Sequence, residues 1–385
     1  MKKIMYVVDF LPNVYNSVGD ILNCLIEKTR FCENIVVKSD GHTYSSLNKE
    51  KINDCLCYSA DTFTITEIKN NNTLTFFQKV RLIFNKYILN FARLIKKGDE
   101  LDRRSNNKYL NQIIKNEKPD LIVFFVYTPK TDYADVCIKN NVDYVFMLYD
   151  TFIARPGVDK KVYLPKEKYV IDNSKAYFIP EFFADEYFKI FGTEKIISFN
   201  LPLLIEKKDV ESAYKNKKNF EFTYFGQIQD FRNGEKIHGI FEELNKKLDV
   251  FTSSDDRHSD DVFIVHNALT KDELYSTVAG SKFLVAFDNS APYNMYLPSK
   301  AYLYVSFTKP VIIFGDNDKS ALKDFLKDYP LWYYQKINEP TDGLIEFINE
   351  NQYSGFDENI YSKYTDFLPE KALKTYSKII KDVIS

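Results

Sequence analysis

The sequence predicts an α/β protein of two doubly wound domains that face a central cleft. Short runs of β-branched and aromatic residues alternate with segments of helical periodicity along the chain, which is the pattern of parallel strands joined by helices. With 385 residues, the chain is long for a single hydrophobic core and sufficient for two. Its 28 tyrosines and 32 phenylalanines predict a tightly packed, folded protein.

The N-terminal domain is predicted to cover residues 1–205. Its expected strands lie at 4–8, 34–38, 120–126, 144–149, 176–179 and 195–199, with a further short strand within 55–69. Helices are expected near 21–26, 134–139 and 184–190. The loop after the first strand lacks the G-x-G-x-x-G pattern, so a dinucleotide cofactor is not indicated.

Three residues of this domain follow strands at the edge of the sheet where ligands bind in open α/β folds: Gly19, Asp20 and Asp150. Asp20 is a candidate catalytic base, and Asp150 is the competing carboxylate. An N-cap role for Asp20 or Ser17 at the start of the first helix is an equally good interpretation.

A charged, apolar-poor segment at 206–219 is predicted to be a linker. The second doubly wound domain is expected at 220–368, with strands at 220–225, 261–266, 283–288 and 311–314. Helices are expected at 235–248, 271–278 and 299–306. An amphipathic helix at 369–385 ends the chain.

Residues 74–97 have the pattern of an amphipathic helix with a basic face, which includes Lys79, Arg81, Lys86 and Arg93. One interpretation is a surface helix whose charges are solvated. The other is a contact with anionic lipid headgroups or with an anionic, lipid-linked acceptor.

Composition narrows the classes of protein that fit. A formal net charge of −2 excludes a generally basic nucleic-acid-binding protein. The five cysteines are odd in number and lie mostly in apolar runs, which predicts reduced core thiols in a cytoplasmic protein. No apolar run of about 18 residues occurs, and residues 1–9 fit a first strand better than a signal peptide. No ligand spacing for a metal is evident, so a metal is not expected.

The most informative stretch is 296–316. Pro298 suits the first turn of a helix, and Lys309-Pro310 ends that helix before a buried strand. Backbone N–H groups at such a helix start, beside Ser299 and the cationic Lys300, are suited to binding a phosphate.

This Pro-Ser-Lys to Lys-Pro-Val-Ile segment resembles the C-terminal domain of nucleotide-sugar glycosyltransferases of the two-Rossmann-domain (GT-B) type, in particular the bacterial group 1 (GT4-like) enzymes. The resemblance extends weakly over the whole chain. It implies that the last helix returns to the first domain and that the first domain binds the acceptor.

The resemblance also implies a donor site in the second domain. In the family, the loop after the first strand of this domain carries an Arg beside a Gly and a Lys five residues further on. Here Gly226 is followed by Gln227, and Arg232 stands at the Lys position, so one cation is absent unless Lys236 replaces it. Arg232 could pair with a diphosphate through a charge-assisted fork.

Two family glutamates that contact the sugar and the ribose correspond to Met295 and Leu303, neither of which can accept a hydrogen bond as a carboxylate does. The residues that could replace them are Asp288, Asn289, Tyr293 and Asn294. His266 and Asn267 stand where the family holds the nucleotide base, although a structural role for His266 is as good an interpretation.

The resulting hypothesis is a metal-independent glycosyltransferase that moves a sugar from a nucleoside-diphosphate sugar, its co-substrate, to a saccharide or lipid-linked acceptor in bacterial surface polysaccharide synthesis. No further cofactor and no nucleic acid are expected. The expected location is the cytoplasm, with peripheral contact at the inner face of the membrane. The alternatives are another GT-B transfer, such as that of a polyol phosphate, and a non-catalytic subunit that binds a saccharide or a partner enzyme.

Overall fold

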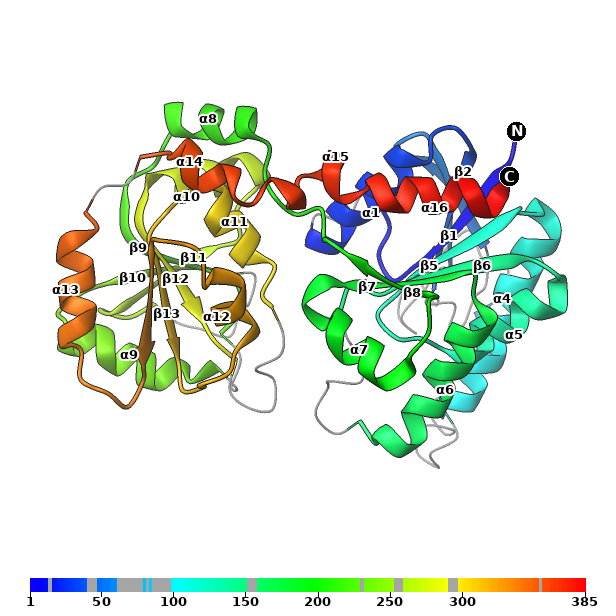
Figure 1. Cartoon of the computed structure of the whole chain (residues 1–385), viewed down its shortest axis with the longest axis horizontal. Helices are drawn as coiled ribbons and strands as arrows, with labels where there is room; N and C mark the ends of the chain where they lie inside the picture. The colour runs from blue at the N-terminus through cyan, green and yellow to red at the C-terminus, as the bar shows by residue number, and fades with distance from the viewer. Residues whose placement is uncertain are drawn as a thin grey trace. The chain divides into compact units, whose positions relative to one another are not determined.

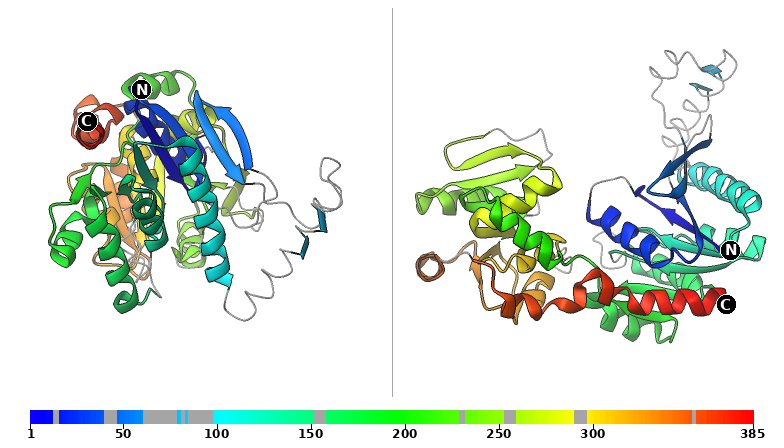
Figure 2. Two further views of the ribbon diagram at one scale, coloured as in Figure 1. Left: turned by 90° about the vertical axis from the view of Figure 1, so that its right-hand side faces the viewer. Right: turned by 90° about the horizontal axis from the view of Figure 1, so that it is seen from above.

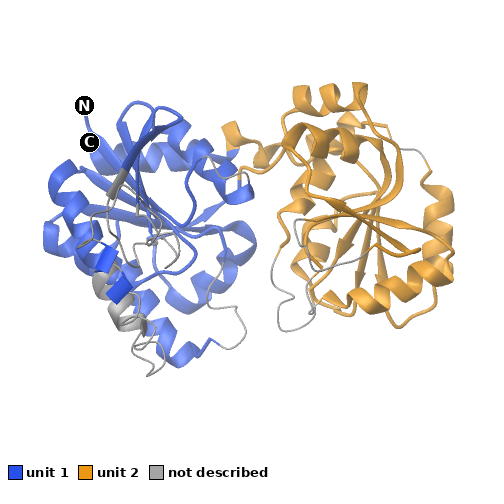
Figure 3. Cartoon of the chain, turned by 180° about the vertical axis from the view of Figure 1, so that it is seen from behind, with its two compact units in different colours: residues 1–153, 158–201, 372–385 blue, residues 154–157, 202–371 orange. Residues whose placement is uncertain are grey.

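The computed structural model describes residues 1–12, 16–39, 47–60, 79–80, 83–84, 98–150, 158–228, 232–252, 259–289, 297–352 and 355–385. The chain forms two compact units (Figures 1 and 3). Unit 1 contains Met1–Ile153, Val158–Leu201 and Ala372–Ser385, and unit 2 contains Pro202–Lys371. The prediction of two parallel-sheet α/β domains is confirmed.

Unit 1 is built on an eight-stranded sheet in the order β3-β4-β2-β1-β5-β6-β7-β8. The strands are β1 (Lys3–Val8), β2 (Glu33–Lys38), β3 (Leu47–Ile52), β4 (Cys55–Ala60), β5 (Leu121–Phe125), β6 (Asp143–Met147), β7 (Ala176–Pro180) and β8 (Ile196–Phe199). Only β3 runs antiparallel to its neighbour among these described strands. The order reverses between β1 and β5, which makes this pair the switch point of the sheet.

Helices cover both faces of this sheet (Figure 2). They are α1 (Ser17–Lys28), α4 (Gly98–Glu117), α5 (Thr131–Asn140), α6 (Lys160–Asn173), α7 (Ala184–Phe191) and α16 (Lys374–Ile384). Helices α4 to α7 share one core with alternate strand residues such as Met5 and Phe124. On the other face, Tyr376 of α16 packs edge-on against Phe178 of β7.

The C-terminal helix is attached to unit 1 by a buried hydroxyl network. The Tyr376 hydroxyl lies 2.9 Å from that of Tyr6, and the Tyr6 hydroxyl lies 2.7 Å from the Thr29 hydroxyl. All three side chains are fully buried, so each hydroxyl needs a partner inside the protein. Residues 372–385 therefore complete the core of unit 1, although unit 2 separates them from it in the sequence.

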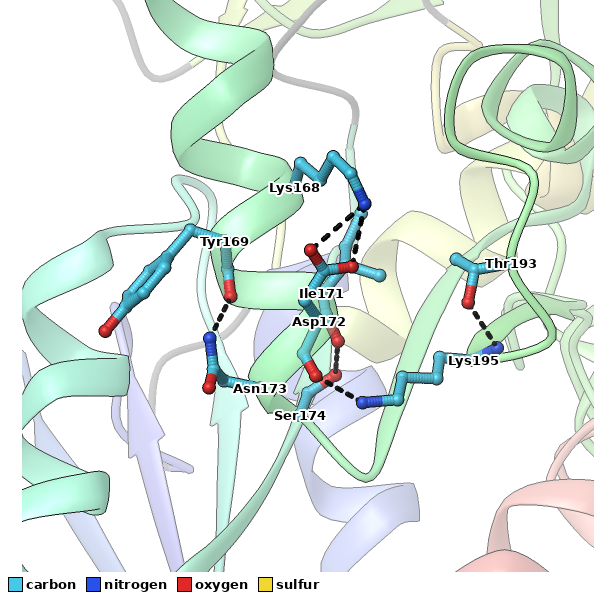
Figure 4. Close-up of polar contacts among 8 residues, drawn as sticks. All are labelled: Lys168, Tyr169, Ile171, Asp172, Asn173, Ser174, Thr193 and Lys195. Carbon is cyan, nitrogen blue, oxygen red and sulfur yellow. Dashed lines mark hydrogen bonds and ion pairs between the residues drawn. The ribbon is translucent and has the colours of Figure 1, made fainter.

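Helix α6 is fixed at its carboxyl end by hydrogen bonds to neighbouring segments (Figure 4). The Ser174 hydroxyl donates to the carbonyl of Ile171 at 2.9 Å, and the Lys195 ammonium donates to the carbonyl of Asp172. These bonds satisfy carbonyl groups that have no partner within the helix. The Lys195 bond also connects α6 to the segment that enters β8.

A carboxyl group lies inside the core of unit 1. Glu167 extends from α6 and is fully buried. Its Oε1 accepts hydrogen bonds from the hydroxyls of Tyr177 at 2.5 Å and Tyr187 at 2.9 Å. Burial raises the pKa of Glu167 to about 7, although both hydrogen bonds favour the ionised form.

Unit 2 contains a six-stranded, all-parallel sheet in the order β11-β10-β9-β12-β13-β14. The strands are β9 (Phe220–Phe225), β10 (Leu248–Thr252), β11 (Phe263–Asn267), β12 (Ser281–Phe287), β13 (Val311–Gly315) and β14 (Trp332–Lys336). The order reverses between β9 and β12. Ligands of open α/β sheets bind beyond the carboxyl ends of such a strand pair.

Helices again lie on both faces. The helices are α8 (Lys207–Lys215), α9 (Gly234–Glu243), α10 (Lys271–Gly280), α11 (Lys300–Ser306), α12 (Ala321–Leu326), α13 (Asp342–Glu350), α14 (Glu358–Ser362) and α15 (Pro369–Ala372). Helices α8, α10, α11, α12 and α14 share one core with the sheet, and α9 and α13 share the other.

The structure differs from the predictions at several elements. The expected linker at 206–219 contains α8, which buries Val210 and Ala213 in the core of unit 2. Strands β3, β10 and β14 and helices α4, α6, α12, α13 and α14 were not predicted. Apart from residues 79–80 and 83–84, the predicted basic helix at 74–97 lies outside the described residues.

Candidate functional site

A pocket opens at the carboxyl ends of β9 and β12, the switch point of the unit 2 sheet. It is lined by Tyr224, Arg232, Ala286, Phe287, Pro298, Lys300, Ala301, Tyr304 and Leu322. None of these described lining residues is acidic, whereas Arg232 and Lys300 are both cationic. The lining thus predicts an anionic ligand.

Arg232 is held in place by uncharged acceptors. Its Nε donates to Asn289 Oδ1 at 3.1 Å, and its NH1 donates to the Tyr224 hydroxyl at 2.9 Å and to the Gln227 carbonyl at 3.0 Å. The Tyr224 ring is stacked on Phe287 with ring centroids 4.2 Å apart, which fixes the hydroxyl that Arg232 meets. These three contacts orient the guanidinium through uncharged groups.

Lys300 is the first residue of α11, and its side chain crosses the backbone of Gly226. A Cβ built on Gly226 would lie 2.8 Å from Lys300 Cε and still closer to Nζ. Desolvation, followed by the charge of Arg232, lowers the pKa of Lys300 to about 8. Within the described part of the chain, no carboxylate forms an ion pair with this ammonium group.

The predicted helix start at 298–300 is close to the observed one. Helix α11 begins at Lys300, with Ser299 at the N-cap position and Pro298 before it, and the Ser299 side chain makes no capping hydrogen bond. Pro298 nevertheless lines the pocket. Leu303, the position of a family glutamate, is buried in the apolar core of unit 2 and does not line the pocket.

Asp288 has the surroundings of a structural carboxylate. It is buried at the end of β12, and its oxygens accept from the backbone N–H of Asn289 at 2.9 Å and the hydroxyls of Ser320 at 3.0 Å and Tyr334 at 3.1 Å. Burial raises its pKa despite these hydrogen bonds. Asp288 thereby supports Asn289, whose side chain accepts from Arg232.

Three other predicted donor residues do not line this pocket. His266 lies 2.7 Å from Asp249 Oδ1 and is stacked on Phe251, which agrees with its structural interpretation. Asn267 is exposed at the end of β11. The Lys236 ammonium donates to Asn338 Oδ1 at 3.3 Å, so it does not replace the absent family cation in this conformation.

The carboxyl edge of the unit 1 sheet is organised by a residue that the sequence analysis did not select. Asp9 follows β1, and its oxygens accept from the Ser39 hydroxyl at 2.8 Å, the Tyr127 N–H at 2.7 Å and the Tyr149 hydroxyl at 3.0 Å. It connects segments that follow four adjacent strands, β2, β1, β5 and β6. An acidic residue directly after the first strand was the signal that could have identified it.

The predicted unit 1 residues lie at the same edge. Asp150 is half-buried after β6, Asp20 is exposed in the first turn of α1, and Gly19 is buried beside it. The N-cap of α1 is Asn16, whose Oδ1 accepts from the Gly19 N–H at 2.8 Å, so neither Ser17 nor Asp20 has that role.

Several predicted residues cannot be placed. Asn294 of the donor set, together with Arg81, Lys86 and Arg93 of the basic segment, lies outside the described residues, whereas Lys79 is half-buried. Among the residues that are described, no group of three or more His, Cys, Asp or Glu side chains could hold a metal ion. None of the described helices is long and apolar enough to cross a membrane.

Comparison with known proteins identifies the fold. No protein-family model and no curated protein matches the sequence. An E. coli trehalose-6-phosphate protein bound with UDP-2-fluoro glucose matches with a TM-score of 0.60 and 10% identity, and the match covers 100% of this chain and 99% of that one. Anabaena HepE in complex with UDP matches with a TM-score of 0.58 and 10% identity over 99% of this chain and 100% of that one. UDP-GlcNAc 2-epimerase from Methanocaldococcus jannaschii matches with a TM-score of 0.53 and 11% identity over 99% of each chain. The chain has the GT-B fold, as its resemblance to that class implied.

Proposed function

We propose that this chain is a glycosyltransferase that uses a nucleoside-diphosphate sugar, with the diphosphate held in unit 2 between Arg232 and Lys300. One observation carries the proposal: two cations converge on a pocket at the sheet's switch point, and no described lining residue is acidic. Further support comes from structures of the same fold whose ligands are UDP and UDP-2-fluoro glucose.

The pocket also suits the chemistry of glycosyl transfer. When the bond from the sugar to the diphosphate breaks, negative charge develops on the leaving diphosphate. Cations already fixed in a partly desolvated pocket stabilise this charge without needing to reorganise. On this basis we propose that Arg232 and Lys300 take the charge-neutralising role and that the transfer is metal-independent.

The remaining parts of the hypothesis concern unit 1. We propose that it binds a saccharide or lipid-linked acceptor and that Asp20 or Asp150 serves as the base that accepts the acceptor proton. The basic segment that contains Lys79 supports an anionic, membrane-associated acceptor, as expected in surface polysaccharide synthesis at the inner face of the membrane.

Calorimetric titration with UDP, GDP and CDP tests the donor site directly. We expect the wild-type protein to bind at least one of them, and Arg232→Ala or Lys300→Ala to weaken binding by roughly tenfold or more, because each removes a charged hydrogen-bond donor. Lys282→Ala is the matched control, since Lys282 is an exposed lysine near the other end of β12.

Two results would contradict the proposal. Unchanged nucleotide affinity in both pocket variants would refute this donor site. Absence of nucleotide binding at millimolar concentration would favour a subunit that binds a saccharide or a partner enzyme. If nucleotide binds, incubation with the corresponding sugar nucleotides separates transfer, seen as release of the nucleoside diphosphate, from epimerisation of the intact donor.

A further inference from the structure

Gly226 and Lys300 are in close contact within unit 2. Gly226 directly follows β9, and its N–H donates to the Phe251 carbonyl at 2.8 Å, so its backbone is fixed by the neighbouring strand β10. Lys300 comes from α11, 74 residues later, and its Cε and Nζ lie against the face of Gly226 that a Cβ would occupy. An alanine at 226 would therefore require the Lys300 side chain to move.

The backbone of Gly226 makes a separate demand for glycine. Its φ of +127° lies in a region that residues with a Cβ rarely adopt. Gly192, which ends α7 in unit 1, also has a positive φ of +57°, but a Cβ there would meet no atom within 4 Å. Both glycines thus have a positive φ. Of the two, only Gly226 also lies against the side chain of a cation of the pocket, Lys300.

Desolvation and the charge of Arg232 both disfavour the ionised form of Lys300 in this position. Besides Lys300, the described lining of the pocket carries the guanidinium of Arg232 and the hydroxyls of Tyr224 and Tyr304, and none of these lining residues is acidic. A lysine side chain that is free to turn toward water would relieve both the desolvation and the repulsion. The open face of Gly226 provides the space that the Cε and Nζ atoms of Lys300 occupy, and a Cβ would remove that space.

We propose that Gly226 is a positioning residue, which seats the Lys300 ammonium beside Arg232 so that a pyrophosphate group meets two fixed cations. This inference rests on the function proposed above. The missing side chain of Gly226 makes room for the lysine.

A double-mutant cycle tests this role, with inorganic pyrophosphate as the calorimetric probe. We expect Gly226→Ala and Lys300→Ala each to weaken binding by roughly tenfold or more. In the Lys300→Ala background, Gly226→Ala should cause no further loss, because the residue through which it acts is already absent. Equal losses in both backgrounds, or unchanged affinity in Gly226→Ala, would overturn the inference.

A second readout requires no ligand. The lysines are reductively methylated with ¹³C, and the resonance that disappears in Lys300→Arg is followed through a pH titration. We expect this lysine to titrate near pH 8 in the wild-type protein and in Gly192→Ala, and closer to its ordinary value of 10.5 in Gly226→Ala. A general loss of stability would not produce that selective shift.

The two measurements separate the proposals. If the wild-type protein binds no pyrophosphate but Lys300 titrates as expected and responds to Gly226→Ala, the proposed function fails and the seating of Lys300 stands. If pyrophosphate binds and Lys300 titrates near 10.5 in the wild-type protein, the donor site stands and the positioning role of Gly226 is wrong.

Discussion

Replacing Glu167 with glutamine is expected to reduce the pH dependence of the stability of unit 1. The folded protein raises the pKa of this buried carboxyl from 4.5 to about 7. Glu167 therefore contributes most to stability below about pH 4.5, and this contribution is lost as pH rises through about 7. The full effect corresponds to about 3 kcal/mol of unfolding free energy, of which about 2 kcal/mol is lost between pH 5.5 and 8.

Glutamine keeps the acceptor and removes the titration. Its side-chain carbonyl can still accept from Tyr177 and Tyr187, while its NH2 group takes the place of Oε2, which has no hydrogen-bond partner in the described structure. Any cost of burying that NH2 group is the same at every pH. The informative quantity is thus the change in stability with pH, and the absolute stability of the variant is secondary.

Native-state hydrogen exchange, followed by mass spectrometry and corrected for intrinsic exchange rates, measures this change for each unit of the intact chain. Peptides from β7 report on unit 1, and peptides from β12 provide the internal control in unit 2. Between pH 5.5 and 8 the wild-type β7 peptides should lose about 2 kcal/mol more protection free energy than those of Glu167→Gln. Equal losses in the two proteins would refute the reasoning.

Three further predictions concern single side chains. Tyr224→Phe should weaken pyrophosphate binding by less than Arg232→Ala does, because it removes one of the acceptors that orient the guanidinium and leaves the charge, and calorimetry would show the order. Tyr376→Phe should lower the unfolding free energy by about 1 kcal/mol in urea denaturation, because it removes a buried hydrogen bond with Tyr6, and an unchanged midpoint would contradict this. Cys137 is buried, and burial raises its pKa, so its thiol should resist a thiol reagent at pH 8 until the protein is unfolded, as peptide mapping can test.

The helices and strands that could be predicted are those whose buried faces are evident from the local pattern of apolar residues. Strands β5 and β13 are continuous apolar runs because both of their faces are covered. Strand β10 was missed because Asp249 interrupts its apolar pattern, and only the folded protein shows that Asp249 pairs with His266. Helix α8 was read as a linker because exposed charges outnumber its two buried residues.

In the candidate site, too, only the residues with a recognisable local sequence pattern could be predicted. Lys300 and Arg232 could be proposed from the sequence because charged residues beside a helix start and a glycine have a recognisable local pattern. The role of Tyr224 could not be anticipated, since nothing within the strand indicates that its hydroxyl meets Arg232. The contact of Lys300 with Gly226 could not be anticipated either, because it depends on the packing of α11 against β9.

The division of unit 1 between the two ends of the chain has a consequence for biosynthesis. As the ribosome makes the protein, residues 1–201 emerge first, but the buried partner of the Tyr6 hydroxyl follows only with residues 372–385. Unit 2 is contiguous over 202–371 and can fold while the earlier unit still exposes the surface that α16 will cover. The order of folding should therefore reverse the order of synthesis, and a chain truncated after residue 371 and released from the ribosome should contain a protease-resistant unit 2 and a protease-sensitive unit 1.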